Sequence, residues 1–218
     1  MTQGAGIFVT FEGIEGSGKS LQVSRTEAFL RTRGIPTLVT REPGGTEFGR
    51  AVRQVLLEAG GPYREPMGEL LLYLADRYQH LHEVIEPALG RGILVISDRY
   101  HDATRAYQGA ARGVPLDTID ALSRLLNIRE PDATILLDLE PEAGLARARL
   151  RNTLDPLAGA EGRFEEESLS FHRKVRKAYL DLAQRSPGRI KVISAMGTTD
   201  EVFARIVPVL EYWLVPTR

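Results

Sequence analysis

An eight-residue stretch near the start of the chain has the residue types of a phosphate-binding loop. Residues 13–20 match the pattern G-x-x-x-x-G-K-[ST], between an apolar run over 7–11 and a helical pattern over 21–33. Glycines allow a tight turn that points backbone N–H groups at phosphate oxygens, and the N-terminus of the following helix adds partial positive charge. A glycine-rich turn that ends in Lys-Ser by chance is the less favoured alternative. We expect a nucleoside triphosphate to contact Gly13, Glu15, Gly16, Ser17, Gly18, Lys19 and Ser20.

Four side chains could bind the phosphates of that triphosphate or the Mg²⁺ that accompanies them. Lys19 would reach the β- and γ-phosphates, and the Ser20 hydroxyl would ligate Mg²⁺. Asp98 follows the apolar run 93–97, so its carboxylate would lie at a strand end and hold Mg²⁺ directly or through water. Arg99 could then neutralise the phosphoryl group during its transfer. The alternative is that Asp98 caps the next helix, with Arg99 as its salt-bridge partner.

Three more residues could bind an acceptor molecule. Arg41 ends an apolar run before a Pro-Gly-Gly turn, where it could grip a phosphate with two hydrogen bonds, or simply lie at the surface. Tyr73 and Arg77 lie one helical turn apart and share a face. An aromatic ring and a guanidinium so placed could stack on a base and donate to its carbonyl, although a Tyr in a leucine-rich helix is more often core.

An irregular stretch over 152–162 has the character of a lid. It contains proline and glycine between two charged helical patterns, with Arg147, Arg149 and Arg151 before it and Arg163 after it. The alternate spacing of the first three spreads them around a helix, so one or two of them belong to a solvated face. A closing loop is nevertheless a common source of the cations that a phosphoryl transfer site requires.

The hydrophobic pattern predicts an α/β fold with a doubly wound parallel sheet. Short apolar runs alternate with longer helical patterns, which is typical of right-handed crossovers with ligands at the carboxyl ends of the strands. The predicted strands are 7–12, 37–40, 93–97, 134–139 and 190–194. The predicted helices are 21–33, 46–59, 67–89, 116–127, 141–151, 165–184 and 200–213. We expect a single domain over 1–218 with a lid over about 147–165.

Composition narrows the class of protein. A chain of 218 residues can bury a sizeable core, and its formal net charge of −1 gives no basic field for a nucleic-acid partner. The absence of cysteine excludes disulfides, thiolate metal sites and a Cys nucleophile. No apolar run approaches the roughly 20 residues that span a bilayer, and the first six residues do not resemble a signal peptide. We expect a cytoplasmic protein without a membrane partner.

Taken together and in order, these motifs resemble the thymidylate kinase family, and the match runs over essentially the whole chain. Each motif alone is weak, whereas the ordered set is highly specific. The matching segments are residues 11–20, 41–46, 71–77, 98–100 and 106–109, together with the arginine-rich lid.

The resemblance implies Mg²⁺-dependent transfer of the ATP γ-phosphoryl group to dTMP, giving dTDP, in a homodimer with a five-stranded parallel sheet. It also implies a role for each matching acceptor residue. Glu15 would bond the deoxyribose 3′-OH, Arg41 and Arg99 would hold the dTMP phosphate, Tyr73 would stack on thymine, Arg77 would donate to thymine O4, Gln108 would contact the base, and Tyr107 would crowd the 2′ position.

The resemblance further assigns the two ends of the donor site. It implies that the loop 187–189, with Arg189, lies on the adenine side of ATP. Because position 16 is Gly rather than Arg, the chain is similar to the bacterial variant that supplies its catalytic arginine from the lid.

The chain departs from the family pattern at two places. Ala103 stands where the family often has Ser, so a base contact is lost or passes to Thr104. The lid usually ends Asp-Arg-x-Glu, but here Gly162 precedes Arg163. Three arginines, Arg147, Arg151 and Arg163, therefore remain candidates for the lid residue that reaches the phosphates. The full catalytic set is Lys19, Arg99, Arg147, Arg151 and Arg163.

Three rival functions remain at this stage. A kinase of the same fold could act on another nucleotide or a small alcohol. A GTPase-like switch would need an Asn-Lys-x-Asp motif, which the chain lacks. A nucleotide-binding protein without catalytic activity is the third rival, because of the altered lid.

Overall fold

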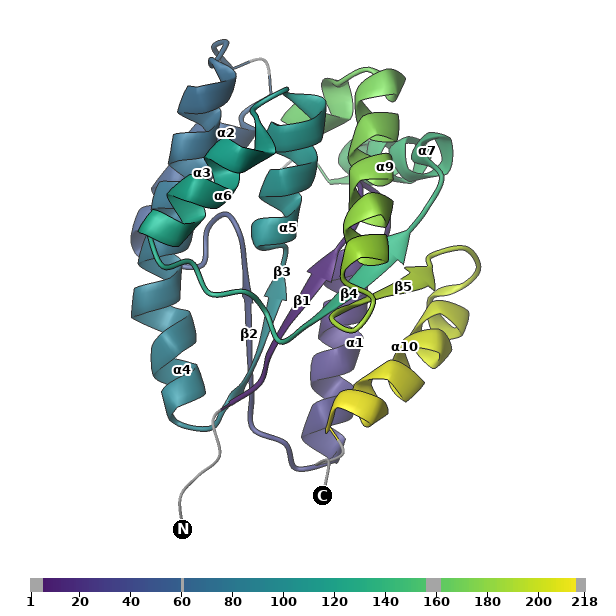
Figure 1. Ribbon diagram of the computed structural model, residues 1–218. Helices are drawn as coiled ribbons and strands as arrows, with labels where there is room; N and C mark the ends of the chain where they lie inside the picture. The colour runs from purple at the N-terminus through teal and green to yellow at the C-terminus, as the bar shows by residue number, and fades with distance from the viewer. Residues whose placement is uncertain (1–5, 60, 156–161, 215–218) are drawn as a thin grey trace.

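Five parallel strands form the centre of the protein, in the order β2-β3-β1-β4-β5. The computed structural model describes residues 6–59, 61–155 and 162–214. The strands are β1 (Phe8–Glu12), β2 (Thr37–Arg41), β3 (Leu94–Asp98), β4 (Ala133–Asp138) and β5 (Ile190–Ser194). Figure 1 shows the strands rising together between helices on both faces. The predicted doubly wound parallel sheet is confirmed, with each strand within about one residue of its predicted bounds.

The middle strand β1 is buried along its whole length, which explains its nearly unbroken apolar sequence. Its one hydroxyl side chain, Thr10, shares a hydrogen bond of 2.8 Å with Thr134 on β4, so neither polar group is left unpaired inside the sheet. β1 pairs with β3 and β4, and this places Phe11 beside Asp98. The end of β1, where the phosphate loop begins, therefore lies next to Asp98.

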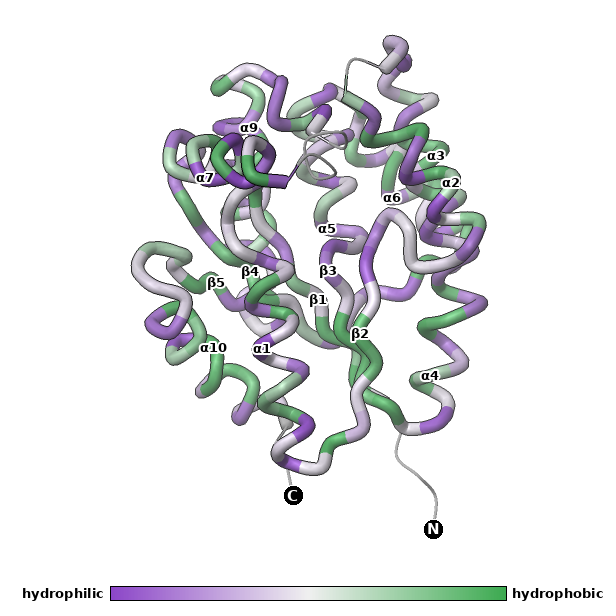
Figure 2. The backbone as a smooth tube through the Cα atoms, turned by 180° about the vertical axis from the view of Figure 1, so that it is seen from behind, coloured by the Kyte–Doolittle hydropathy of each residue, from purple (hydrophilic) through white to green (hydrophobic). Residues whose placement is uncertain are grey.

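Helices cover the sheet in two layers. Helices α1 and α10 pack together on one face and are seen in front in Figure 2, while α4, α5 and α9 cover the other face in Figure 1. The α-helices are α1 (Lys19–Thr32), α2 (Glu47–Leu57), α3 (Pro66–His80), α4 (Glu86–Gly90), α5 (His101–Thr104), α6 (Leu116–Leu125), α7 (Pro141–Leu154), α9 (Leu169–Arg185) and α10 (Thr199–Leu214). The other helical turns are η1 (Leu81–Ile85), η2 (Arg105–Ala111) and η3 (Arg163–Glu166).

Three helical regions differ from the sequence expectations. The helix predicted over 67–89 is divided by the π-helical turn η1, just before Pro87, whose ring nitrogen cannot donate to the helix ladder. The helix predicted over 165–184 begins only at Leu169, because the Ser168 side chain accepts a hydrogen bond from the Phe171 N–H and caps it there. The helical segment over 101–111 is not among the predicted elements.

The lid predicted over 147–165 is described only at its two ends. Helix α7 continues to Leu154, further than predicted, and the chain is described again from Gly162. Residues 156–161 of the predicted lid lie outside the described residues. Within the part of the chain that is described, no helix is both long and apolar enough to cross a bilayer.

Candidate active site

A cavity of about 1020 Å³ opens at the carboxyl ends of β1, β2 and β3. This is the edge of the sheet at which a doubly wound fold binds its ligands. Most of the residues predicted to do chemistry line it. Those residues are Glu15, Gly16, Gly18, Lys19, Ser20, Arg41, Tyr73, Arg77, Asp98, Arg99, Ala103, Thr104, Tyr107, Gln108, Arg147 and Arg151.

The phosphate loop holds Lys19 over its own backbone. The Lys19 ammonium donates to the carbonyl oxygens of Gly13, at 3.0 Å, and Ile14, at 2.9 Å. Gly13 and Ser17 do not line the cavity themselves, but their oxygens lie within reach of the ammonium. Burial lowers the pKa of Lys19 to about 8, with the nearby charge of Arg99 acting in the same direction. A bound anion would therefore stabilise the charged form of Lys19, which burial disfavours.

Gly16 meets the first turns of α7 with no room for a side chain. Its φ is +71°, and a Cβ at this position would overlap the carbonyl of Gly144. In turn, a Cβ on Gly144 would lie 2.5 Å from the Glu15 carbonyl oxygen. The helix that leads to the lid thus rests directly on the phosphate loop. This contact explains why position 16 cannot carry an arginine in this arrangement.

Ser20 and Asp98 form a pair of oxygen ligands beside the loop. The Ser20 hydroxyl donates to Asp98 Oδ2 at 2.6 Å, because β3 ends next to the start of α1. Mg²⁺ prefers hard oxygen donors and usually takes only one or two from the protein, with phosphates and water for the rest. Among the described residues no cluster of three or more His, Cys, Asp or Glu side chains could hold a metal ion by itself. The pair therefore fits Mg²⁺ that arrives with a nucleotide.

Glu15, Arg99 and Tyr107 form a buried cluster between the loop and η2. Arg99 Nη2 donates to Glu15 at 2.8 Å, and the Tyr107 hydroxyl donates to the same carboxylate at 2.7 Å. Burial alone would raise the pKa of Glu15, but the charge of Arg99, with help from His172 and Lys19, holds the pKa below its usual range. The carboxylate is thus fixed, ionised and 7% exposed toward the cavity.

Arg99 is positioned by its backbone as well as by its partners. Its φ of +71° lies in the left-handed region that a non-glycine residue seldom adopts. The turn is held because Arg99 N–H donates to the Phe11 carbonyl at 2.9 Å and Tyr100 N–H donates to Glu12 at 2.8 Å. Glu12 also accepts from the Tyr179 hydroxyl at 2.7 Å. Glu12, at the end of the central strand β1, therefore supports the backbone turn that carries Arg99.

Arg77 is almost completely buried at the far end of the cavity, where its guanidinium is 1% exposed. It donates to Glu42 at 2.7 Å, to the Thr104 hydroxyl at 2.8 Å and to the Tyr100 carbonyl at 3.0 Å. His101 lies 3.4 Å from the same guanidinium. Four of its five N–H groups have these neighbours, so one can face the cavity.

Glu42 balances this buried cation. It pairs with Arg77 through one oxygen and with His80 Nδ1, at 2.9 Å, through the other. Asp76 lies beside it and accepts the Gly44 N–H at 3.1 Å. Burial, followed by the charge of Glu42, raises the pKa of Asp76 to about 7. The base end of the cavity is therefore a closely coupled polar network rather than a single exposed arginine.

Gln108 has a defined amide orientation. Its Nε2 donates to Glu69 at 2.8 Å, and Glu69 also accepts from Arg163. The amide oxygen of Gln108, which lines the cavity, is then the atom available to a ligand. Tyr73, Ala103 and Thr104 also line the cavity.

The three lid candidates occupy different places. Arg147 and Arg151 line the cavity, and they donate to the Ala195 carbonyl at 3.1 Å and to Glu165 at 2.8 Å. Arg163 does not line it, because its guanidinium donates to Glu69 and to the Leu56 carbonyl. The geometry brings Arg147 and Arg151 to the site and leaves Arg163 outside the cavity lining.

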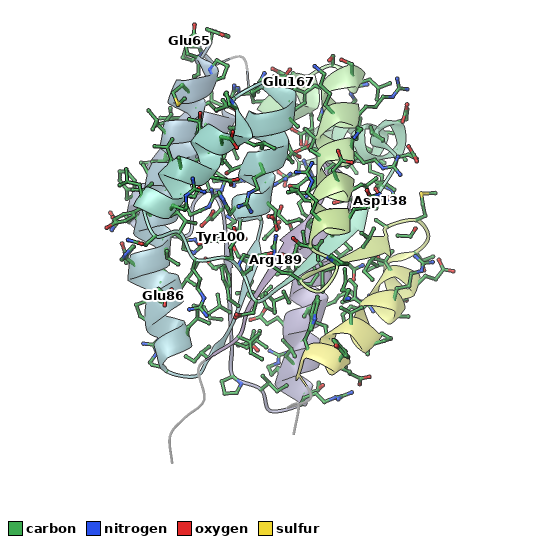
Figure 3. All side chains as sticks on the ribbon, viewed as in Figure 1. Glu65, Glu86, Tyr100, Asp138, Glu167 and Arg189 are labelled. Carbon is green, nitrogen blue, oxygen red and sulfur yellow. The ribbon has the colours of Figure 1, made fainter. Side chains whose placement is uncertain are left out.

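Arg189 lies away from the cavity, at the amino end of β5. Its guanidinium forms a two-bonded pair with Asp102, at 2.7 and 2.9 Å, and also donates to Thr134. Figure 3 shows Arg189 near the lower end of α9, while Glu167 lies near the upper end. Parallel strands bind ligands at their carboxyl ends, so the loop before β5 is at the wrong edge. We correct the assignment of Arg189 to the adenine side on this ground.

Comparison with known proteins identifies the family of the chain. The model of the family described as thymidylate kinase matches residues 11–206. The chain belongs to the thymidylate kinase family.

Relatives named thymidylate kinase match along nearly their whole length. The one from Syntrophotalea carbinolica is 52% identical over 202 residues, covering 91% of this chain and 92% of the relative. The one from Desulfosudis oleivorans is 47% identical over 206 residues, covering 94% and 96%. A crystal structure of thymidylate kinase from Ehrlichia chaffeensis is 31% identical with a TM-score of 0.74, covering 94% of this chain and 99% of that one.

Sequence reasoning missed several residues of this thymidylate kinase site. Arg53 of α2 lines the cavity and donates to the Pro43 carbonyl at 3.0 Å. Phe164 lines it from the far side of the lid and packs edge-to-face on Tyr107, with ring centroids 5.2 Å apart. The position of Glu42 between an arginine and a proline could have indicated a structural carboxylate. Neither Arg53 nor Phe164 gives a comparable signal.

Proposed function

We propose that the chain transfers the γ-phosphoryl group of ATP to dTMP, giving dTDP. The observation that supports the proposal is a cavity with a phosphate loop at one end and a buried, hydrogen-bonded arginine at the other. Lys19 lies at the first end, Arg77 at the second, and the cluster of Glu15 and Tyr107 between them. Such a cavity can hold a triphosphate, a monophosphate, a deoxyribose and a base in line.

The donor side would use the loop for its phosphates. Loop N–H groups and Lys19 would bind the β- and γ-phosphates, while Ser20 and Asp98 would hold Mg²⁺ with them. Bound Mg²⁺ would supply charge neutralisation at the transferring group. For the adenine we propose the loop 195–198, because it follows β5 at the carboxyl end of the sheet and contacts Arg147 of α7.

On the acceptor side, separate residues would bind the phosphate, the sugar and the base of dTMP. Arg41 and Arg99, with Arg53, would hold the dTMP phosphate, Glu15 would accept a hydrogen bond from the 3′-hydroxyl, and Tyr73 would stack on the base. Arg77 would donate to thymine O4, and the Gln108 amide oxygen would accept the N3–H. Cytosine presents the opposite donor and acceptor at these two atoms, so this pair would reject it.

Catalysis would consist of positioning and electrostatic stabilisation. An acceptor phosphate is already largely ionised at neutral pH, with a second pKa of about 6, so its oxygen can attack without a strong general base. Lys19, Arg99 and the lid arginines Arg147 and Arg151 would stabilise the developing charge. A lid over about 147–165 would exclude water as a competing acceptor.

We also propose that the protein is a homodimer. Large apolar side chains are exposed on α2, α3 and α6, which lie side by side in Figure 1. They are Phe48, Val55, Met67, Leu71, Tyr78, Leu116 and Leu125. Light scattering should give twice the chain mass of 24.2 kDa, and Phe48→Glu should shift it toward the monomer. The cytoplasmic location remains a prediction.

A coupled ADP-release assay with Mg·ATP tests the acceptor. The panel is dTMP, dUMP, UMP, dCMP, dGMP and shikimate. We expect the highest turnover with dTMP, weak turnover with UMP because Tyr107 crowds the 2′ position, and little with dCMP. Preference for another acceptor would reject the thymine pocket but keep the phosphate loop.

A further inference from the structure

His172 is a buried polar side chain that the phosphoryl-transfer scheme above does not use. It lies in the first turns of α9 and has no exposed surface. Its Nε2 lies 2.9 Å from the carbonyl oxygen of Phe164 in η3, and its Nδ1 lies 3.3 Å from Glu15 Oε2. The Nδ1 contact is an ion-pair distance rather than a well-directed hydrogen bond, since this atom has no hydrogen-bond partner among the described residues.

Both neighbours of the ring are hydrogen-bond acceptors. A carbonyl oxygen and an ionised carboxylate can each accept but not donate, so the imidazole satisfies both only by donating from both nitrogens. The His172 ring also packs edge-to-face against Phe171, with ring centroids 5.5 Å apart. Both ring nitrogens therefore face acceptor atoms, one on the phosphate loop and one on η3.

The two acceptors belong to parts of the site that are far apart in sequence. Glu15 is the residue of the phosphate loop that faces the acceptor side of the cavity. Phe164 and Glu165, in the helical turn η3 at the end of the predicted lid, line the same cavity. His172 thus joins the phosphate loop to η3, at the end of the predicted lid.

We propose that His172 is a positioning residue for the acceptor. It fixes the Glu15 carboxylate in the orientation that accepts a hydrogen bond from the 3′-hydroxyl of the nucleotide. Through its contact with Phe164, it also links that orientation to the position of η3. Arg99 and Tyr107 hold the other side of the same carboxylate, so His172 completes a three-sided clamp. The inference rests on the proposed function, because it assumes a dTMP acceptor whose 3′-hydroxyl meets Glu15.

Two amide variants separate the two contacts of the ring. In His172→Asn the amide nitrogen can take the place of Nδ1, which keeps a donor for Glu15 and removes the donor to Phe164. In His172→Gln the longer amide can take the place of Nε2, which keeps the donor to Phe164 and removes the one to Glu15. Each variant keeps one of the two donors, so the two variants serve as controls for each other.

The readout is the preference for an acceptor with a 3′-hydroxyl. Values of kcat/KM are measured with Mg·ATP for dTMP and for 3′-deoxy-dTMP, which lacks only that hydroxyl. We expect His172→Gln to lower kcat/KM for dTMP about tenfold and to change the value for 3′-deoxy-dTMP less than about twofold. His172→Asn should keep most of the wild-type preference. A parallel loss with both acceptors in His172→Gln would show a structural role only and would overturn the proposal.

A measurement on the wild-type protein needs no variant to fold. The chain has four histidines, so the ¹⁵N signals of their rings can be assigned. A proton on Nδ1 of His172 would support the contact with Glu15, and an unprotonated Nδ1 would overturn the proposal. Failure of the proposed function is distinct from both results, because then the wild type itself would not use dTMP.

Discussion

The two ends of the cavity recognise their ligands by different means. The phosphate end is a single stretch, residues 13–20, whose backbone and one lysine lie within a few ångströms of each other. The base end is assembled from β2, α3, α5 and η2, with side chains holding other side chains. A phosphate is compact and highly charged, so local N–H groups suffice for it. A flat base needs donors and acceptors placed at separate points.

The difference has an energetic consequence. At the phosphate end each backbone group acts almost alone, so a side-chain change there removes one contact. At the base end Arg77, Glu42 and His80 share one buried network, so a change in one member leaves another charge unpaired. We expect substitutions at the first end to affect catalysis and those at the second to affect both catalysis and stability.

The largest effect should come from Lys19→Ala. Loss of the buried ammonium removes charge stabilisation from the transferring group, and turnover should fall on the order of a thousandfold. Because the Lys19 ammonium donates to atoms of the phosphate loop, dTMP binding measured by calorimetry should be nearly unchanged. Lys174→Ala, on the exposed side of α9, is the control. An equal loss of dTMP affinity in Lys19→Ala would contradict the separation of the two ends.

Arg77→Met tests the base end. It removes the base donor and leaves Glu42 with only His80, so kcat/KM for dTMP should fall about a hundredfold and the free energy of unfolding about 3 kcal/mol. The KM for ATP should stay near the wild-type value. Adding Glu42→Gln should recover stability but not activity, as urea titration and kinetics would show. Full retention of stability in Arg77→Met would mean that the network is not coupled.

The lid arginines should show a smaller and divided effect. Arg151→Ala removes a cation that lines the cavity, so kcat should fall between about tenfold and a hundredfold. Arg163→Ala should instead lower thermal stability and change kcat less, because its guanidinium is engaged with Glu69 and Leu56. Arg149→Ala, exposed on α7, is the control in steady-state assays. A larger kcat loss in Arg163→Ala than in Arg151→Ala would reverse our assignment.

The same contrast explains what could be predicted from the sequence. The phosphate end was predictable because its chemistry lies in one continuous motif, and the strands were predictable because buried parallel strands are continuous apolar runs. His172 could not be assigned in this way, since its partner Glu15 lies 157 positions away along the chain. The spacing of Arg147, Arg151 and Arg163 likewise does not reveal which of them is engaged by Glu69.

The error at Arg189 has a different cause. A loop beside a strand can lie at either edge of the sheet, and its order in the sequence decides which. Residues 187–189 precede β5, so they lie at the amino end, where Arg189 pairs with Asp102. The position of this loop before β5 in the sequence is enough to place Arg189 away from the carboxyl ends of the strands, where ligands bind.

The smallest effect concerns Glu12, which supports the turn of Arg99 between the two ends. Burial, together with the charge of Asp102, raises its pKa from 4.5 to about 7. Between these values the folded state binds more protons than the unfolded state, so the free energy of unfolding should decrease as the pH rises from about 4.5 to 7.

Glu12→Gln should remove this pH dependence while keeping both hydrogen bonds. The amide oxygen can still accept from Tyr100 N–H, and the amide nitrogen can donate to the Tyr179 hydroxyl. Relative to the wild type, the ligand-free variant should gain about 2–3 kcal/mol between pH 5 and pH 8, since one pKa unit corresponds to about 1.4 kcal/mol. Urea titrations at several pH values measure the difference. If the two curves stay parallel, Glu12 is ionised throughout and the Arg99 turn is held by a buried charge.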